Sequence, residues 1–294
     1  MLVVDDNVTA LQAEVRLDDS ATAADIERRG RDRAEIGRRI WLATWPKVAA
    51  IALALLLWQI VVWSGWRPEY VLPAPATVFD RLGELIADGT VFDAVAVTMR
   101  RALVGFTLAV AIGVVVGGIV ASSKIARSAV GSMITGLQTM PSIAWFPLAI
   151  LLFQLSEGAI TFVVVLGAAP SIANGLIAGV DHVPPVLLRA GHMMGARGFD
   201  KFRHVVLPAS LPSFVGGLKQ GWAFAWRSLM AGELLVTLGV FSVGFLLQQY
   251  RSVNDTPSLI AIMIVILTVG ILVDALVFGT LDRWVRRRYG LLTD

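Results

Sequence analysis

The sequence predicts an all-α membrane protein with six transmembrane helices. Its mean hydropathy is +0.72 over 294 residues, and only 16% of these residues are charged, which is too few to cover the surface of a soluble domain of this size. Apolar segments recur along the chain, and each supplies the roughly 20 residues that a helix needs to cross a bilayer. We place the six spans at 47–66, 95–121, 130–153, 159–180, 212–238 and 258–279.

The chain divides into a polar N-terminal tail, residues 1–40, and a transmembrane domain, residues 41–294. The tail contains the charged stretch DIERRGRDRAEIGRRI, whose opposite charges at helical spacing favour a partly helical segment. Because Lys and Arg near a span favour the inner side of the membrane, we expect this tail in the cytoplasm.

The distribution of Lys and Arg predicts that both termini are cytoplasmic. It also explains the net charge of +3 without nucleic acid as a partner. With six apolar spans, we expect a multi-pass protein of the inner (plasma) membrane. Arg100 and Arg101, near the outer end of the second span, go against the rule. The inner segments hold the tail arginines, Lys124, Arg127, Arg189, Arg197, Lys201, Arg203 and the C-terminal DRWVRRRYG, and the outer segments hold Arg67, Arg81 and Arg251.

The sequence excludes several kinds of chemistry. It has no cysteine, which removes disulfides, thiolate metal sites and cysteine nucleophiles. It has no Gly-rich phosphate loop ending in Lys-Ser or Lys-Thr and no Gly-x-Ser-x-Gly elbow. His182, His192 and His204 do not share a helical face with a carboxylate, as a zinc site requires. We therefore expect no catalytic residue, metal or cofactor in this chain, and an intramembrane enzyme is a poor fit.

Two patterns concern helix packing. Small residues four apart, in GVVVG, GLIAG and GLKQG, predict that their helices approach neighbours closely. In the outer segment 67–94, Val78, Leu82, Leu85 and Ile86 share one face of a short helix, which we expect to lie on the outer membrane surface. The glycines of the three motifs are Gly113, Gly117, Gly175, Gly179, Gly217 and Gly221.

Charged residues inside the spans point to a polar interior. A charge that faces lipid at mid-bilayer costs about 2.5–3.5 kcal/mol, so Lys219, Arg227 and Glu233 of the fifth span should face protein or water. Arg227 leaves two hypotheses open. Its guanidinium attracts an oxyanion such as a sulfonate, or it forms a structural pair that holds two copies of the chain together, for which Glu233 of either copy is a candidate. Asp274 is expected to pair with the arginines that follow it.

The third span carries Pro141 and Pro147, which interrupt helix hydrogen bonds in a way that is tolerated where neighbours or a water-filled cavity satisfy the freed backbone groups. The candidate translocation residues are therefore the polar and aromatic residues near this break and along the fifth span. They are Gln138, Ser142, Trp145, Gln220, Trp226, Arg227 and Glu233.

The stretch GARGFDKFRHVVLP, from Gly195 to Pro208, interrupts the apolar chain. The loop begins with Pro184 and Pro185, which suit the first turn of a helix, and Gly195 permits a sharp turn. A second short helix, from Phe199 to Val206, is expected to end before Pro208. Apolar side chains ringed by positive charge suit docking into a groove on another protein.

This loop resembles the signature of the permease subunits of ATP-binding-cassette importers, which reads Glu-Ala-Ala, three residues, Gly, nine residues, Ile, one residue, Leu-Pro. The spacing from Gly195 to Pro208 fits in full, whereas Arg189 stands in place of Glu, Gly191 in place of Ala and Val205 in place of Ile. The resemblance implies that the loop 184–208 is the coupling helix, which sits in a cleft of the ATPase subunit. The expected contact residues are Arg189, Ala190, Gly191, Gly195, Phe199, Phe202, Val205, Leu207 and Pro208.

The resemblance extends from about Leu72 to the C-terminus. LPAPATVFDRL and MPSIAWFPLAILLF resemble the branch that imports aliphatic sulfonates, taurine and nitrate, and GLKQGWAFAWRSLMAGELL is most similar to the sulfonate permeases. The resemblance implies a type I importer permease fold that is embedded in a lipid bilayer and forms a homodimer. Its further partners are two ATPase subunits, which bind ATP and Mg, and an external solute-binding protein. The implied cargo is a small anionic solute, an aliphatic sulfonate first, with nitrate or taurine as alternatives.

A secondary transporter would need a coupling-ion site and usually an internal repeat, and neither is evident.

Overall fold

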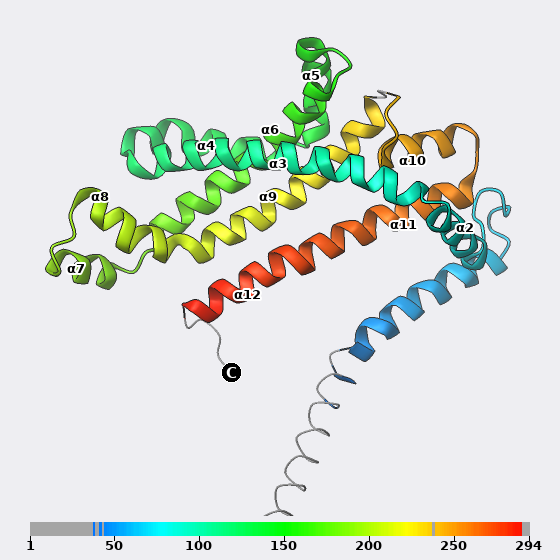
Figure 1. Cartoon of the computed structure of the whole chain (residues 1–294), viewed down its shortest axis with the longest axis horizontal. Helices are drawn as coiled ribbons and strands as arrows, with labels where there is room; N and C mark the ends of the chain where they lie inside the picture. Colours follow the sequence, from blue (N-terminus) through cyan, green and yellow to red (C-terminus); the bar gives the residue numbers. More distant parts are fainter. Residues whose placement is uncertain (1–37, 39–40, 43, 237–238, 290–294) are drawn as a thin grey trace, which may run out of the picture. The chain divides into compact units, whose positions relative to one another are not determined.

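The computed structural model describes residues 38, 41–42, 44–236 and 239–289, and these residues form helices joined by short turns (Figure 1). The predicted cytoplasmic tail lies outside the described residues apart from Arg38. By packing, the chain divides into two compact units, Met1–Pro68 and Glu69–Asp294. The first unit contains one apolar helix, Thr44–Trp63, of 20 residues.

The second unit holds the remaining helices. α11, η3 and α12 run on from one another as a single apolar helix, Thr256–Arg288. In chain order, the elements are α2 (Pro75–Ala87), α3 (Thr90–Ser122), α4 (Lys124–Thr139), η1 (Ser142–Trp145), α5 (Phe146–Phe153), α6 (Glu157–Asp181), α7 (Pro185–Met193), α8 (Gly198–Lys201), η2 (Phe202–Val206), α9 (Leu207–Leu235), α10 (Val243–Ser252), α11 (Thr256–Val273), η3 (Asp274–Phe278) and α12 (Gly279–Arg288).

The all-helical transmembrane class is confirmed, but the spans are not six uniform helices. Among the described residues, four helices are long and apolar enough to cross a bilayer: Thr44–Trp63, Thr90–Ser122, Glu157–Asp181 and Thr256–Arg288. The predicted third span is broken, because Ile125–Thr139 and Ser142–Phe153 meet at 104°; if this bent pair counts as one span, there are five. α9 has 29 residues, enough length for a crossing, but it is not among the described helices that are apolar enough.

The core lies where α6 packs between α3 and α9 (Figure 1). Close approach at this crossing requires glycine. A Cβ atom built on Gly175 would lie 2.5 Å from Gly217 Cα, and one built on Gly113 would lie 2.9 Å from the Ala169 carbonyl oxygen. All three small-residue motifs meet a neighbouring helix in this way, so the predicted close packing is confirmed.

α2 buries its apolar face within the second unit. Val78 and Leu85 are buried, and the helix packs against α11 and α3, so this face is not free to lie on a membrane surface as expected. Arg81 fixes the contact, because its Nε donates a hydrogen bond of 2.8 Å to Ser258 Oγ. The hydrogen bond that Arg81 makes with Glu84 raises the pKa of Arg81 above its ordinary value.

Candidate functional site

The loop 184–208 forms two short helical pieces around a glycine turn. α7 begins at Pro185, as its proline pair predicts. It ends at Met193, and the chain turns at Gly195, whose φ of +87° lies in the left-handed region. There the Gly195 N–H donates to the His192 carbonyl at 3.0 Å, and the Ala196 N–H donates to the Gly191 carbonyl at 2.9 Å. This pair of hydrogen bonds is a Schellman closure, in which glycine avoids the steric cost of the left-handed conformation.

Two departures from the signature fall on one contact. A Cβ atom built on Gly191 would lie 2.7 Å from Val205 Cγ2. Gly191 is buried, and Val205 is half-buried. α7 therefore packs on the second piece through residues that are both smaller than the Ala and Ile of the signature, and this contact holds the two pieces together.

Pro208 does not end the second piece, which corrects the prediction. α8 passes through η2, a turn of π-helix, directly into α9, and Leu207 N–H closes this turn onto the Phe202 carbonyl. A proline ring clashes with the carbonyl four residues earlier in a regular α-helix, and the wider π turn just before Pro208 is one of the known ways to accommodate it. The second piece of the loop 184–208 and the fifth predicted span, residues 198–235, are thus one continuous helical rod (Figure 1).

The loop presents exposed apolar side chains beside cations. Met193 is 88% exposed, Met194 79% and Phe199 71%. Arg189, Ala190 and Phe202 are also exposed. Exposed apolar patches of this kind mark contact sites for another protein or a membrane.

A cavity of about 360 Å³ with both polar and apolar side chains in its wall lies where the broken third span meets α9. Three of the predicted translocation residues, Gln138, Ser142 and Arg227, come together in its wall, although they lie far apart in sequence. Thr139, Met140, Pro141, Ile143, Phe224 and Ala231 complete the lining. The bend at Pro141 thus contributes to the wall of a cavity.

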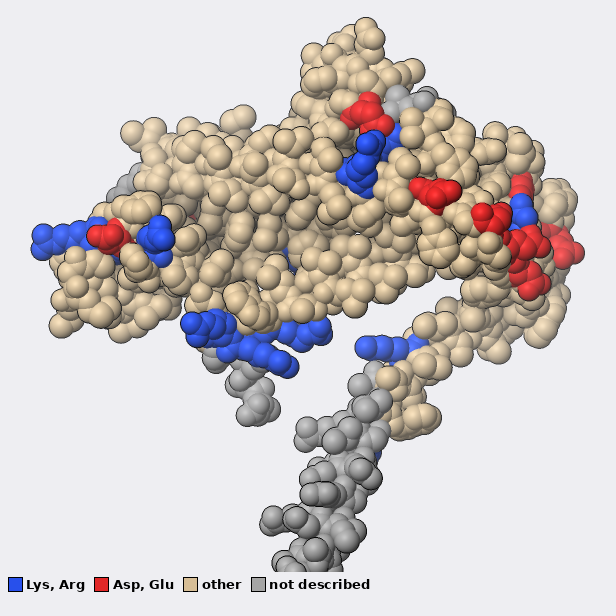
Figure 2. Space-filling model, in the orientation of Figure 1, with Lys and Arg blue, Asp and Glu red and all other residues tan. Residues whose placement is uncertain are grey.

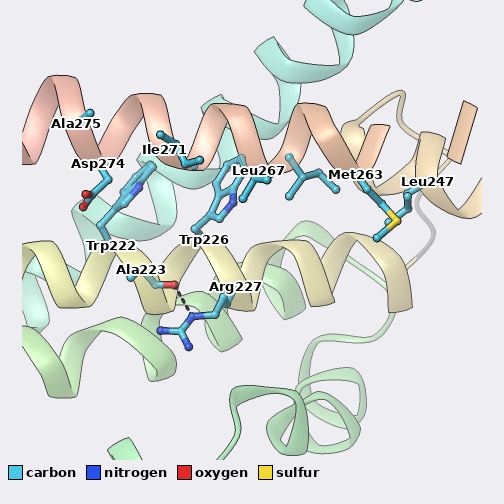
Figure 3. Close-up of a pocket in the computed structure, with 12 residues that line it drawn as sticks. Trp222, Ala223, Trp226, Arg227, Leu247, Met263, Leu267, Ile271, Asp274 and Ala275 are labelled. Carbon is cyan, nitrogen blue, oxygen red and sulfur yellow. Dashed lines mark hydrogen bonds between the residues drawn. The ribbon is translucent and has the colours of Figure 1, made fainter. Parts of the chain in front are cut away.

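Arg227 is exposed and carries no ion pair to a carboxylate within the described part of the chain. Its Nε donates to the Ala223 carbonyl at 3.0 Å, and its guanidinium carbon lies 4.7 Å from the centre of the Phe224 ring. Figure 3 shows the side chain turned away from α11, whereas Trp226 points toward α11. Within the described residues, the Nη1 and Nη2 atoms of Arg227 make no hydrogen bond.

The remaining candidates have other surroundings. Gln138 is held to α6, because its Nε2 donates to Ser171 Oγ at 2.9 Å and its Oε1 accepts from Asn174. Trp145 packs against the apolar core, and Gln220 is exposed outside the cavity. Trp226 lines a second, mainly apolar groove of about 660 Å³ between α9 and α11 (Figure 3).

Glu233 belongs to a buried ion network and does not pair with Arg227 of its own chain. Arg101 Nη1 lies 2.9 Å from Glu233 Oε1, and the Glu233 side chain is fully buried. The other oxygen accepts at 3.0 Å from Thr98 Oγ1 and at 3.0 Å from the Gly244 N–H. Arg101 also pairs with the half-exposed Glu157 at 2.5 Å. The sequence did flag Arg101, as a cation on the wrong side of the positive-inside rule.

Asp274 likewise has a different partner from the one expected. Its carboxylate lies 3.2 Å from Lys219 Nζ of α9. The arginines that follow Asp274 lie at least two helical turns away along the same rod, whereas α9 runs beside it. The pair joins the fifth and sixth predicted spans.

Comparison with known proteins agrees with this architecture. Residues 109–287 match the family described as binding-protein-dependent transport system inner membrane component. A putative ABC transporter permease of Methanocaldococcus jannaschii is 30% identical over 78% of this chain and 86% of its own length. A putative aliphatic sulfonates transport permease of Bacillus subtilis is 27% identical over 77% and 81%, and a nitrate import permease of Synechocystis is 28% identical over 78% and 86%.

The fold agrees as well. The MetNI methionine ABC transporter, solved in an inward-facing conformation, contains a chain that matches with a TM-score of 0.52 and 23% identity, over 69% of this chain and 95% of that one. This likeness identifies a type I importer permease fold, and the family match makes the chain a multi-pass inner-membrane protein. The chain therefore belongs to the family of binding-protein-dependent inner membrane components, the permease subunits of ATP-binding-cassette importers for small solutes.

Proposed function

We propose that this permease conducts a small anion, an aliphatic sulfonate first, along a path lined by Gln138, Ser142 and Arg227. The observation that carries the proposal is the cavity in which these residues meet, with an arginine that has no carboxylate partner in the described chain. A guanidinium group offers paired N–H donors that match oxyanion geometry. The cavity, at about 360 Å³, lies within the range of small-molecule sites.

The relatives favour an anion without selecting one. Two of them are named for aliphatic sulfonates and for nitrate, at 27% and 28% identity. These cargoes share oxygen atoms that carry negative charge, which is the feature Arg227 recognises. We place the sulfonate first because the fifth-span stretch around Arg227 is most similar to the sulfonate permeases, and nitrate remains the alternative.

The loop 184–208 is the proposed contact with the ATPase. In the assembly that we propose, two copies of this chain join two ATPase subunits, which bind ATP and Mg, and an external solute-binding protein delivers the cargo. The exposed Met193, Met194 and Phe199 enter a groove on the ATPase. Because the loop continues without interruption into α9, displacement of the loop moves the helix that bears Arg227, and the spans rock between outward-open and inward-open states.

The proposal is tested with the complete transporter in proteoliposomes, together with the external binding protein. We expect ATP-dependent uptake of labelled ethanesulfonate, with excess unlabelled nitrate competing weakly. Uptake that requires an ion gradient in place of ATP would identify a secondary transporter. Strong competition by nitrate, together with failure of the binding protein to bind sulfonates, would replace the sulfonate with the alternative cargo.

A further inference from the structure

α12 carries a basic face whose charges have few partners. The helix is anchored through Val285, which is 2% exposed, and it packs against α9. At 100° per residue, Arg283 and Arg287 lie about 160° around the axis from Val285, on the side that faces away from the bundle. Figure 2 shows Lys and Arg gathered over this end of α12.

The local contacts leave much of this charge unneutralised. Arg286 pairs with Asp282 at 2.8 Å, one turn earlier. Arg283 donates only to the neutral Thr280 hydroxyl, at 3.2 Å, and in the described part of the chain no carboxylate lies within ion-pair distance of Arg283, Arg287 or Arg288. Trp284 lies between these arginines on the helix and is 60% exposed.

The depth of the patch places it at a membrane interface. The helix Thr256–Arg288 has 33 residues and is about 50 Å long, whereas the hydrocarbon core is about 30 Å thick. Apart from Asp274, which pairs with Lys219, the stretch from Leu259 to Phe278 carries no charge, and its length matches that thickness. Arg283 then lies about 7 Å beyond the end of this stretch and Arg288 about 15 Å beyond it. The cluster therefore begins in the headgroup layer, where tryptophan is also enriched, and the long side chains of the outer arginines reach back toward it.

We propose that Arg283, Trp284, Arg287 and Arg288 form a binding surface for anionic phospholipid headgroups. Charge complementarity supports lipid as the occupant, because clustered Lys and Arg just beyond a span attract anionic lipid phosphates. The continuity of α12 with a membrane-crossing helix keeps the surface at headgroup depth, and the exposed indole suits the border between acyl chain and headgroup. This surface is separate from the cavity lined by Gln138, Ser142 and Arg227 and from the loop 184–208.

The test measures lipid access to Trp284 in the assembled transporter with its ATPase subunits. Phospholipids brominated near the headgroup end of the acyl chain quench nearby indoles, and the difference between wild type and Trp284→Phe isolates Trp284. We expect brominated phosphatidylglycerol to quench Trp284 more strongly than brominated phosphatidylcholine. The triple variant R283Q/R287Q/R288Q should lose this preference, the triple Lys variant should keep it, and the control R251Q, on α10, should leave it unchanged.

Three results would overturn the proposal. They are equal quenching of wild type by the two lipids, a preference that survives the triple Gln variant, and absence of any quenching by lipid at Trp284 in the assembled complex. The last result would mean that an ATPase subunit covers this face. ATP-dependent uptake is a separate readout, so failure of the lipid proposal leaves the transport proposal standing.

Discussion

At the scale of single residues, the buried ion network is the feature that the sequence marked without resolving. Arg101 and Glu233 were both conspicuous, one for breaking the positive-inside rule and the other as a carboxylate inside a span. Pairing them needs the relative rotation and depth of two helices, which hydropathy does not contain. The sequence therefore offers Glu233 only as one candidate partner for Arg227, which lies about 120° away on the same helix, whereas the partner of Glu233 is Arg101 on α3.

Removing Arg101 should destabilise the assembled transporter. Arg101→Gln leaves Glu233 buried without a cation, and breaking a buried pair in this way costs about 3–5 kcal/mol. The melting curve of the complex in detergent should shift to lower temperature, and adding Glu233→Gln should restore part of the loss. Arg100→Gln is the matched control, because Arg100 is exposed. Equal melting of Arg101→Gln and Arg100→Gln would contradict the network.

At the scale of helices, the sequence predicted where helices lie better than how they join. The prolines at 141 and 208 were both recognised as interruptions. One produces a bend of 104° and the other continues through a π turn. A proline removes one hydrogen-bond donor, but the direction of the chain afterwards depends on the tertiary contacts available, here α6 and the core at Pro141 and α7 beside the π turn before Pro208.

The crossing of α6 and α9 offers a matched pair of glycines for mutation. Gly217→Val places new atoms against the Gly175 backbone, whereas a Cβ on neighbouring Gly216 meets open space. Overpacking typically costs 1–3 kcal/mol, so we expect Gly217→Val to lower the melting temperature clearly and Gly216→Val to change it little. If the two variants melt alike, close packing at this crossing is not what requires glycine.

The coupling-loop prediction concerns docking and not insertion. Gly195→Val forces a β-branched residue to φ +87°, which costs roughly 1–2 kcal/mol and opens the turn. The variant Phe199→Asp/Phe202→Asp removes the exposed aromatic groups. Both should reach the membrane but retain less ATPase on purification, while Gly118→Val, in open space on α3, should retain it fully. Wild-type ATPase stoichiometry and transport in the double Asp variant would refute the assignment.

At the scale of the whole molecule, the transmembrane class, the family and the loop with its turn were accessible from composition and motif spacing. Acidic side chains gather at the α2 end of the second unit, and basic ones gather at the α7, α8 and α12 ends (Figure 2). By the positive-inside rule, this distribution favours an orientation in which the α7, α8 and α12 ends face the cytoplasm. The cavity was accessible only in part. Its residues were named, but Trp145, Gln220, Trp226 and Glu233 lie outside its wall, because periodicity gives a helical face and not its neighbour.

The orientation is tested by thiol labelling, which the absence of cysteine makes free of background. Ser252 and Ser128 are both exposed. A Cys at 252 should react with an impermeant reagent added outside intact cells, and a Cys at 128 should react only after permeabilisation. The reverse pattern would overturn the orientation with both termini inside.

The central claim, that Arg227 serves the passage of an anion, is tested most directly by ATP-dependent uptake of labelled sulfonate alongside a melting curve of the same complex. Arg227 has no carboxylate partner in the described chain, so Arg227→Gln should abolish uptake while assembly, basal ATP hydrolysis and melting stay near wild type. Arg227→Lys keeps the charge but loses the planar fork, and it should retain partial uptake. Lowered melting of Arg227→Gln that a second change in a partnering carboxylate restores, or uptake that survives Arg227→Gln, would contradict the account.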